Sequence, residues 1–204
     1  MTTIAIIGAG PLGRWLALAA ARAGYRVLLE DVMPSNLHHA QEYLRQQLSP
    51  PNVSADVSRR GTTSVVPNEP QKTTWALAPE VRPETVAFVS TIEDAVREAD
   101  LAIDCVPDEL ESKLEILWLL DRMAPPKTVL ATPTTNLSIA DLAACTYRPE
   151  KCIAIAAAPR SLSGENPGSP IHLRITARTT PETIALVESF WRRLGFHPTF
   201  ECSD

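Results

Sequence analysis

The chain has 204 residues, of which 45% are hydrophobic and 21% charged, and its formal net charge is −5 at pH 7. This length suits one domain with a full hydrophobic core. The acidic balance argues against nucleic acid as a partner, because no basic surplus is available to neutralise phosphates. No apolar run approaches the roughly 20 residues that span a bilayer, so we expect no membrane partner. The N-terminus lacks the basic start of a signal peptide, which favours a cytoplasmic location.

The first 48 residues alternate between strand and helix patterns. Residues 3–7 (TIAII) form an apolar run bounded by glycine, which is typical of a strand buried on both faces. A helical spacing of apolar residues follows over 11–23, and residues 26–30 (RVLLE) predict a second strand. Residues 35–48 predict a second helix, capped by Ser35. This order predicts a parallel sheet covered by helices.

Residues 49–85 differ from the rest of the chain, because prolines gather there among Ser, Thr, Asn and Arg. A stretch of this length without helix or strand patterns is uncommon inside a compact domain. We therefore expect a proline-rich insertion, either a functional loop or a disordered segment.

The alternation resumes after the insertion. Further strands are expected over 85–89, 101–106, 128–132, 151–158, 171–176 and 197–202, and helices over 91–99, 108–123, 138–146 and about 181–194. Ser138 is expected to cap its helix, and Trp118, with the leucines of helix 108–123, is expected in the core. The whole chain is thus predicted to be a single α/β domain of Rossmann type, with a doubly wound, mostly parallel sheet and helices on both faces.

The four cysteines occupy apolar or strand-like contexts and form no C-x-x-C pair; they are Cys105, Cys145, Cys152 and Cys202. We expect reduced, buried thiols, as in a cytoplasmic protein, and no metal site.

The turn between the first strand and the first helix reads Gly8-x-Gly10-x-x-Gly13. In a dinucleotide-binding turn these glycines allow a tight bend, a close backbone approach to the pyrophosphate, and close packing of helix on strand. The backbone around Pro11 and Leu12, at the helix start, would face the phosphates with its N–H groups and the helix dipole. The alternative is a turn that only connects strand to helix.

An acidic residue is expected about 20 residues later, at the end of the second strand, to accept hydrogen bonds from the adenosine ribose. Asp31 fits this position, and Glu30 is the fallback. A carboxylate there repels a 2′-phosphate and Val32, not an arginine, follows, so NAD is favoured over NADP.

Three ordered stretches carry a family resemblance: IAIIGAGPLGRWLALAAARAGYRVLLED, TIEDAVREADLAIDCVPDELESKLEIL and MAPPKTVLATPTTNLSIADLAACTYRPEKCIAI. With these landmarks the chain resembles the NAD-binding domain of the 3-hydroxyacyl-CoA dehydrogenases of fatty-acid oxidation, over 1–48 and 86–204. The resemblance implies an NAD-dependent oxidoreductase that acts on a CH–OH group. It also implies that Asp108 and Lys113 lie near the nicotinamide ribose. Apart from the resemblance, Lys113 would be a solvated helix lysine.

The chain departs from the family where the chemistry takes place. After the strand that matches CIAIAAA, family members carry a histidine that removes the hydroxyl proton as hydride leaves for NAD. Here Ala156 stands in its place, and the carboxylate that orients the histidine falls near His172. Thr135 keeps a hydroxyl at a substrate-facing serine position. The resemblance thus makes Thr135 and His172 the candidate catalytic residues.

Two of these polar residues have a structural alternative. His172 is either a displaced base or a histidine on the half-exposed face of a late strand, with Ile171 and Leu173 pointing the other way. Asp104, where the family has a glutamate, is expected to form structural hydrogen bonds at a strand end.

The resemblance also implies a second, helical domain that supplies much of the substrate cleft. General-base assistance contributes about 10²–10⁴-fold, and positioning contributes about 7–11 kcal/mol. We therefore expect an NAD(H)-binding protein that is weak or inactive on 3-hydroxyacyl-CoA by itself. Its substrate would be an acyl-CoA or another small hydroxy or keto compound, with a homodimer or a partner chain completing the cleft. The alternative is a non-catalytic NAD(H)-binding regulatory or redox-sensing module.

Overall fold

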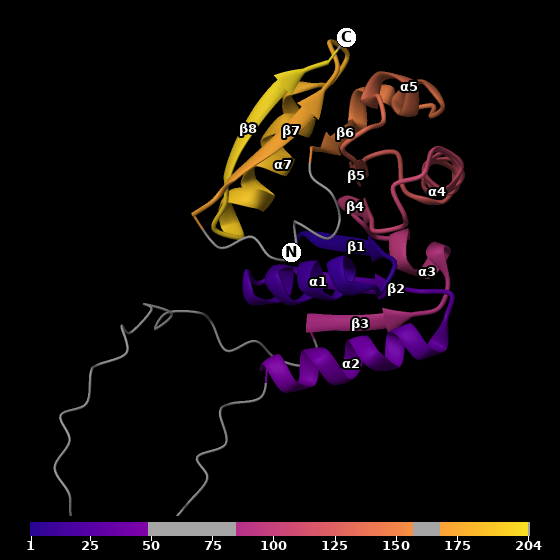
Figure 1. The fold of residues 1–204 in the computed structure, drawn as a ribbon, viewed down its shortest axis with the longest axis vertical. Helices are drawn as coiled ribbons and strands as arrows, with labels where there is room; N and C mark the ends of the chain where they lie inside the picture. The colour runs from indigo at the N-terminus through magenta and orange to yellow at the C-terminus, as the bar shows by residue number, and fades with distance from the viewer. Residues whose placement is uncertain (49–84, 157–167, 204) are drawn as a thin grey trace, which may run out of the picture.

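One eight-stranded sheet organises the chain, in the order β3-β2-β1-β4-β5-β6-β7-β8 (Figure 1). The computed structural model describes residues 1–48, 85–156 and 168–203, so the proline-rich insertion lies almost entirely outside the described residues. The strands are β1 (Thr3–Ile7), β2 (Arg26–Glu30), β3 (Val86–Val89), β4 (Leu101–Asp104), β5 (Val129–Pro133), β6 (Cys152–Ile155), β7 (Pro170–Ile175) and β8 (His197–Cys202). The helices are α1 (Pro11–Arg22), α2 (Pro34–Leu48), α3 (Ile92–Val96), α4 (Leu110–Met123), α5 (Ile139–Ala144), the 3₁₀ helix η2 (Pro149–Lys151) and α7 (Pro181–Arg193).

The strand pairing confirms the predicted Rossmann-type arrangement. Strands β1 to β6 are parallel, β7 is antiparallel to β6, and β8 is parallel to β7. Strand β1, buried along its whole length, lies between β2 and β4. The chain therefore leaves the sheet in opposite directions after β1 and after β4, which opens a crevice at their carboxyl ends.

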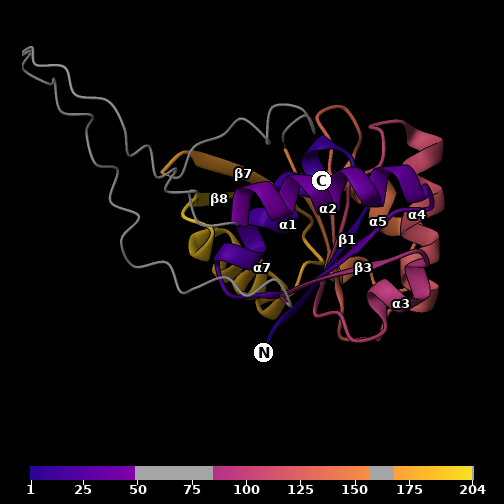
Figure 2. The same cartoon turned by 90° about the horizontal axis from the view of Figure 1, so that it is seen from below.

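Helices cover both faces of the sheet. Apolar side chains of α1, α2 and α7 form one core with one face, and those of α3, α4 and α5 form a second core with the other. Figure 2 shows these two groups of helices on either side of the sheet. No helix among the described residues combines the length and apolar character needed to cross a membrane.

Helix starts agree only in part with expectation. Ser138 caps α5 as predicted, since its hydroxyl accepts a hydrogen bond from the Asp141 N–H at 3.3 Å. The prediction that Ser35 caps the second helix is wrong, because α2 begins one residue earlier, at Pro34. A proline suits the first helical position, where an N–H has no intrahelical partner.

The prediction that Trp118 is buried is also wrong, since this side chain is 48% exposed. Helix α4 turns a different stripe toward the sheet, consisting of Lys113, Ile116, Leu117, Leu120 and Asp121. Because Lys113 faces inward, Trp118, five residues later, faces outward. Leu110, the first residue of the helix, is also exposed.

Only part of the cysteine prediction holds. Cys152 is buried, and burial raises the pKa of its thiol to about 11. Cys105 is partly buried, and the desolvation of its sulfur raises its pKa strongly. Cys145, at the C-terminal end of α5, and Cys202, at the end of β8, are exposed, so burial was wrongly predicted for these two.

Candidate functional site

The glycine turn brings the end of β1, the start of α1 and the end of β4 together. Gly8 has a φ of +103°, and its N–H donates to the Glu30 carbonyl at 2.8 Å. A Cβ at Gly13 would lie 1.8 Å from the Gly8 oxygen, so only glycine lets α1 pack this closely on the turn. A Cβ at Gly10 would meet nothing within 4 Å. The turn is thus closely packed at Gly8 and Gly13 and open at Gly10.

The start of α1 has the features of an anion-binding site, since no side chain caps it and no acidic residue lies in its first turn. Gly10 is the N-cap residue and provides no side-chain hydrogen bond, Pro11 follows it, and the first turn contains no acidic residue. The N–H groups of Leu12 and Gly13 belong to the first turn, where an α-helix offers its amides no carbonyl partner. These donors and the positive end of the helix dipole face the space beside Gly10.

Asp31 connects this turn to the end of β2. Its buried carboxylate accepts a hydrogen bond from the Ala9 N–H at 2.8 Å and another from the Met33 N–H at 2.8 Å. The Asn36 side-chain amide donates to both carboxylate oxygens at 3.1 Å. The carboxylate is therefore held beside the glycine turn in a fixed orientation. Sequence analysis missed Asn36, whose role depends on how the first turn of α2 folds back.

A second polar group forms at the carboxyl ends of β4 and β5. Asp108 Oδ2 accepts a hydrogen bond from the Thr135 N–H at 3.1 Å, and the Thr135 hydroxyl lies 3.4 Å from the same oxygen. The other carboxylate oxygen, Asp108 Oδ1, is buried and has no hydrogen-bond partner among the described residues. The structure thus joins two of the predicted site residues, and beside them one buried carboxylate oxygen of Asp108 has no partner among the described residues.

Lys113 is not the solvated helix lysine that the sequence pattern alone would suggest. Its side chain is fully buried, and its Nζ lies 2.5 Å from Asp104 Oδ1, which is also fully buried. The alternative of a solvated helix lysine is therefore wrong, because the ammonium is held under the crevice by the carboxylate at the end of β4. No pattern of helix periodicity could indicate this, since periodicity treats lysine as a surface residue.

The ends of β6 and β7 place Ala156 opposite His172. The Ala156 N–H donates to the His172 carbonyl at 2.8 Å. The imidazole is exposed, and its Nδ1 lies 2.9 Å from the Thr199 hydroxyl on β8. Ile171 and Leu173 are buried on the opposite face of β7. The His172 ring thus contacts Thr199 on β8, which is separated from β6 and Ala156 by β7.

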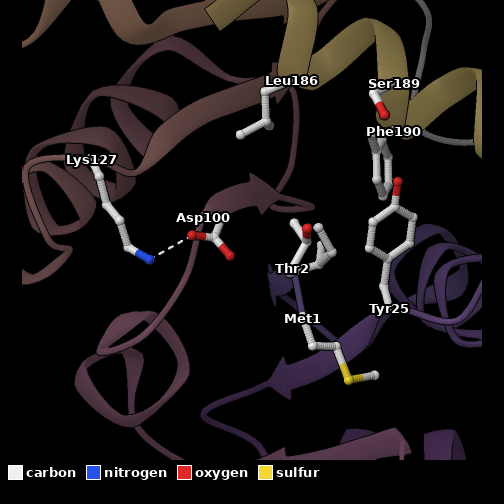
Figure 3. Close-up of a pocket in the computed structure, with 9 residues that line it drawn as sticks. Met1, Thr2, Tyr25, Asp100, Lys127, Leu186, Ser189 and Phe190 are labelled. Carbon is white, nitrogen blue, oxygen red and sulfur yellow. Dashed lines mark hydrogen bonds and ion pairs between the residues drawn. The ribbon is translucent and has the colours of Figure 1, made fainter. Parts of the chain in front are cut away.

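A separate pocket of about 450 Å³ opens at the amino ends of the strands, opposite to the end that carries the glycine turn (Figure 3). Asp100, directly before β4, and Lys127, two residues before β5, lie on its wall and form an ion pair. Figure 3 shows the Tyr25 hydroxyl directed toward the α7 side of this pocket. Because the pocket lies at the amino ends of the strands, none of the predicted site residues lines it.

The residues around the glycine turn fit a dinucleotide. The open space at Gly10 leaves room for a pyrophosphate against the backbone, and the first amides of α1 would bind it. The Asp31 carboxylate, held in a fixed orientation, would accept hydrogen bonds from ribose hydroxyls. Val32 and Met33, which follow it, are exposed apolar side chains.

Comparison with known proteins agrees with this geometry. The family model described as 3-hydroxyacyl-CoA dehydrogenase, NAD binding domain, matches residues 3–157. A probable 3-hydroxybutyryl-CoA dehydrogenase of Bacillus subtilis is 32% identical over 152 residues, which are 74% of this chain and 46% of that protein. An L-carnitine dehydrogenase of Burkholderia mallei is 30% identical over 203 residues, or 96% of this chain and 53% of that protein.

Solved structures show the same fold. The crystal structure of the (S)-3-hydroxybutyryl-CoA dehydrogenase PaaH1 from Ralstonia eutropha superposes with a TM-score of 0.76 at 20% identity. The match covers 100% of this chain and 64% of that one. The chain spans about half the length of the curated relatives that it matches.

Proposed function

Since the chain belongs to the 3-hydroxyacyl-CoA dehydrogenase family, as an NAD-binding domain, we propose that it binds NAD(H) at the glycine turn, with Asp31 on the adenosine ribose. The observation that carries this proposal is the contrast within the turn. Gly13 is closed by the Gly8 carbonyl, whereas Gly10 faces open space at the start of α1. A glycine that packing does not require is explained by a ligand that approaches its backbone.

The second polar group extends the proposed site toward the nicotinamide. Asp108 and Thr135 would lie at the nicotinamide ribose, where Asp108 Oδ1 has no partner among the described residues. Lys113 would act indirectly, because its ammonium is bonded to Asp104 beneath the crevice. When bound, NAD supplies the hydride acceptor for the oxidation of a CH–OH group.

We infer further that the chain alone is weak or inactive on 3-hydroxyacyl-CoA. The described residues of β6 and β7 contain one imidazole or carboxylate, His172, and its ring bonds to Thr199 on β8. Ala156, opposite it, has no side chain that accepts a proton. A small hydroxy or keto compound, or an acyl-CoA as in the names of several relatives, remains the proposed substrate class.

Isothermal titration with NADH tests the binding proposal. We expect micromolar affinity for the wild-type protein, weaker binding for Asp31→Ala and none for Gly10→Val. Asp94→Ala, an exposed carboxylate on α3, is the matched control and should bind like wild type. NADPH should bind more weakly than NADH, because the Asp31 carboxylate repels a 2′-phosphate. No heat and no thermal shift at millimolar NADH would refute the proposal.

Turnover is measured separately, as acetoacetyl-CoA-dependent oxidation of NADH. We expect a rate near background, because Ala156 cannot act as a general base and the His172 ring is bonded to Thr199 on β8. Turnover at ordinary enzyme rates would contradict the proposed inactivity and leave the NADH-binding proposal intact. Binding without turnover on any small hydroxy or keto compound would favour the regulatory or redox-sensing alternative.

A further inference from the structure

Arg174 is a cation on β7 whose side chain reaches the carboxyl end of β5. Strands β5, β6 and β7 are neighbours in the sheet (Figure 1). Thr132, Ala154 and Arg174 are register partners across these three strands, so their side chains share one face of the sheet. Because Ala154 is small, the arginine side chain extends past β6, and its Nη2 donates a hydrogen bond to the Thr134 carbonyl at 2.6 Å. The sheet thus brings a guanidinium from β7 to the loop that follows β5.

One peptide unit connects Arg174 to Asp108. The carbonyl of this unit belongs to Thr134 and accepts from Arg174, and its N–H belongs to Thr135 and donates to Asp108 Oδ2 at 3.1 Å. Two hydrogen bonds and one peptide unit separate Arg174 Nη2 from Asp108 Oδ2, so these atoms lie at most about 8 Å apart. With Asp108 at the nicotinamide ribose, as in the proposed function on which this step rests, Arg174 lies near the nicotinamide end of the cofactor.

The positive charge of Arg174 has no counterion in the described part of the chain. A guanidinium is always protonated and has five N–H donors. None of the ion pairs between described residues includes Arg174. Its Nε is buried without a hydrogen-bond partner, although the residue as a whole is only half-buried and is in part open to solvent. A partly desolvated cation with donors to spare favours an anionic ligand.

We propose that Arg174 binds a free carboxylate of the substrate, which is then a short hydroxy or keto acid. A planar guanidinium matches the two oxygens of a carboxylate and binds them through parallel hydrogen bonds. The Thr134 carbonyl holds Nη2 and thereby fixes the orientation of the guanidinium. The acid is short because Arg174 and Asp108 are bonded to the same peptide unit. A thioester carries no charge at its carbonyl, so Arg174 favours the free acid over its acyl-CoA.

Calorimetric titration of the NADH-saturated protein tests the proposal with 3-hydroxybutyrate and its amide, which differ in charge but hardly in shape. Ligand and cofactor are both in the reduced form, so no turnover disturbs the measurement. We expect the wild type to bind the acid at least about tenfold more tightly than the amide, because charge-assisted hydrogen bonds are the stronger ones. Arg174→Gln keeps a donor for the Thr134 carbonyl and should abolish this preference without changing NADH binding. Arg178→Gln, at an exposed position on the β7–α7 connection, is the matched control and should keep the preference.

The Nε–H signal of Arg174 in heteronuclear NMR reports the contact directly, and its absence from Arg174→Gln or Arg174→Lys assigns it. Millimolar 3-hydroxybutyrate should shift this signal, whereas the amide should not. Arg174→Lys keeps the charge but not the planar donor set, so its preference for the acid should be intermediate.

Equal affinities for acid and amide in a protein that binds NADH would overturn this inference and leave the proposed function intact. A protein that does not bind NADH would overturn both. A preference for the acid that survives Arg174→Gln would place the carboxylate on another cation, and an Arg174 signal that the acid does not move would likewise contradict the contact.

Discussion

Lys113 Nζ lies 2.5 Å from Asp104 Oδ1, and both side chains are fully buried. The pair joins the first turns of α4 to the end of β4, and Asp108 lies in the connection between these two elements. A buried ion pair contributes little net stability relative to apolar residues, but the loss of one partner leaves an uncompensated charge. The rotation of α4 on the sheet, and with it the outward direction of Trp118, follows from this inward-facing lysine.

Lys113→Met should therefore lower the free energy of unfolding by about 3–5 kcal/mol, because it strands the Asp104 carboxylate in the core. The matched control is Lys127→Met, which removes the partly exposed ion pair with Asp100 and should lower it by at most about 1 kcal/mol. Urea denaturation measures both values. Equal losses for the two variants would show that Lys113 does not compensate a buried charge.

The strand–helix order and the glycine turn could be predicted because they depend on local patterns. Buried parallel strands appear as apolar runs, and the spacing from Gly8 to Asp31 follows from the length of one strand–helix–strand unit. The environment of Lys113 could not be predicted in this way, because it depends on Asp104, which reaches α4 only through tertiary packing. The same holds for Asn36, which holds Asp31 only once α2 folds back over β2.

Two single-methyl substitutions should separate packing from binding in the glycine turn. Gly13→Ala places a Cβ 1.8 Å from the Gly8 oxygen, so we expect a loss of about 1–3 kcal/mol of stability. Gly10→Ala meets no protein atom within 4 Å and should cost less than about 1 kcal/mol, yet weaken NADH binding. Thermal melting and NADH titration of both variants measure these effects. Tight NADH binding by Gly10→Ala would place the pyrophosphate elsewhere.

The thiols should react in the order of their exposure. Cys145 is exposed, whereas Cys152 is buried with its pKa raised to about 11 by desolvation. At pH 8 a disulfide reagent such as dithionitrobenzoate should modify Cys145 rapidly, and Cys152 only after unfolding, because the thiolate is the nucleophile. Cys145→Ser should remove one equivalent from the fast phase. If Cys152→Ser removed that equivalent instead, the burial of Cys152 would be contradicted.

Glu30 should make the folded protein less stable as the pH rises toward neutrality. Burial at the end of β2, and then the neighbouring Asp31 carboxylate, raise the pKa of Glu30 from 4.5 to about 7. Between these values the folded state holds a proton that the unfolded state has released, so stability falls as the pH rises through this window. The full effect is on the order of 3 kcal/mol.

Glu30→Gln keeps the shape of the side chain and removes the titration, so it should abolish this fall. Urea denaturation at pH 4.5, 6 and 7.5 gives the free energy of unfolding of the wild type and of Glu30→Gln. The variant should become increasingly more stable than the wild type as the pH rises. Glu182→Gln, at an exposed position in the first turn of α7, controls for the loss of one negative charge and should run parallel to wild type. Parallel curves for wild type and Glu30→Gln would mean that Glu30 ionises in the folded protein as easily as in the unfolded chain.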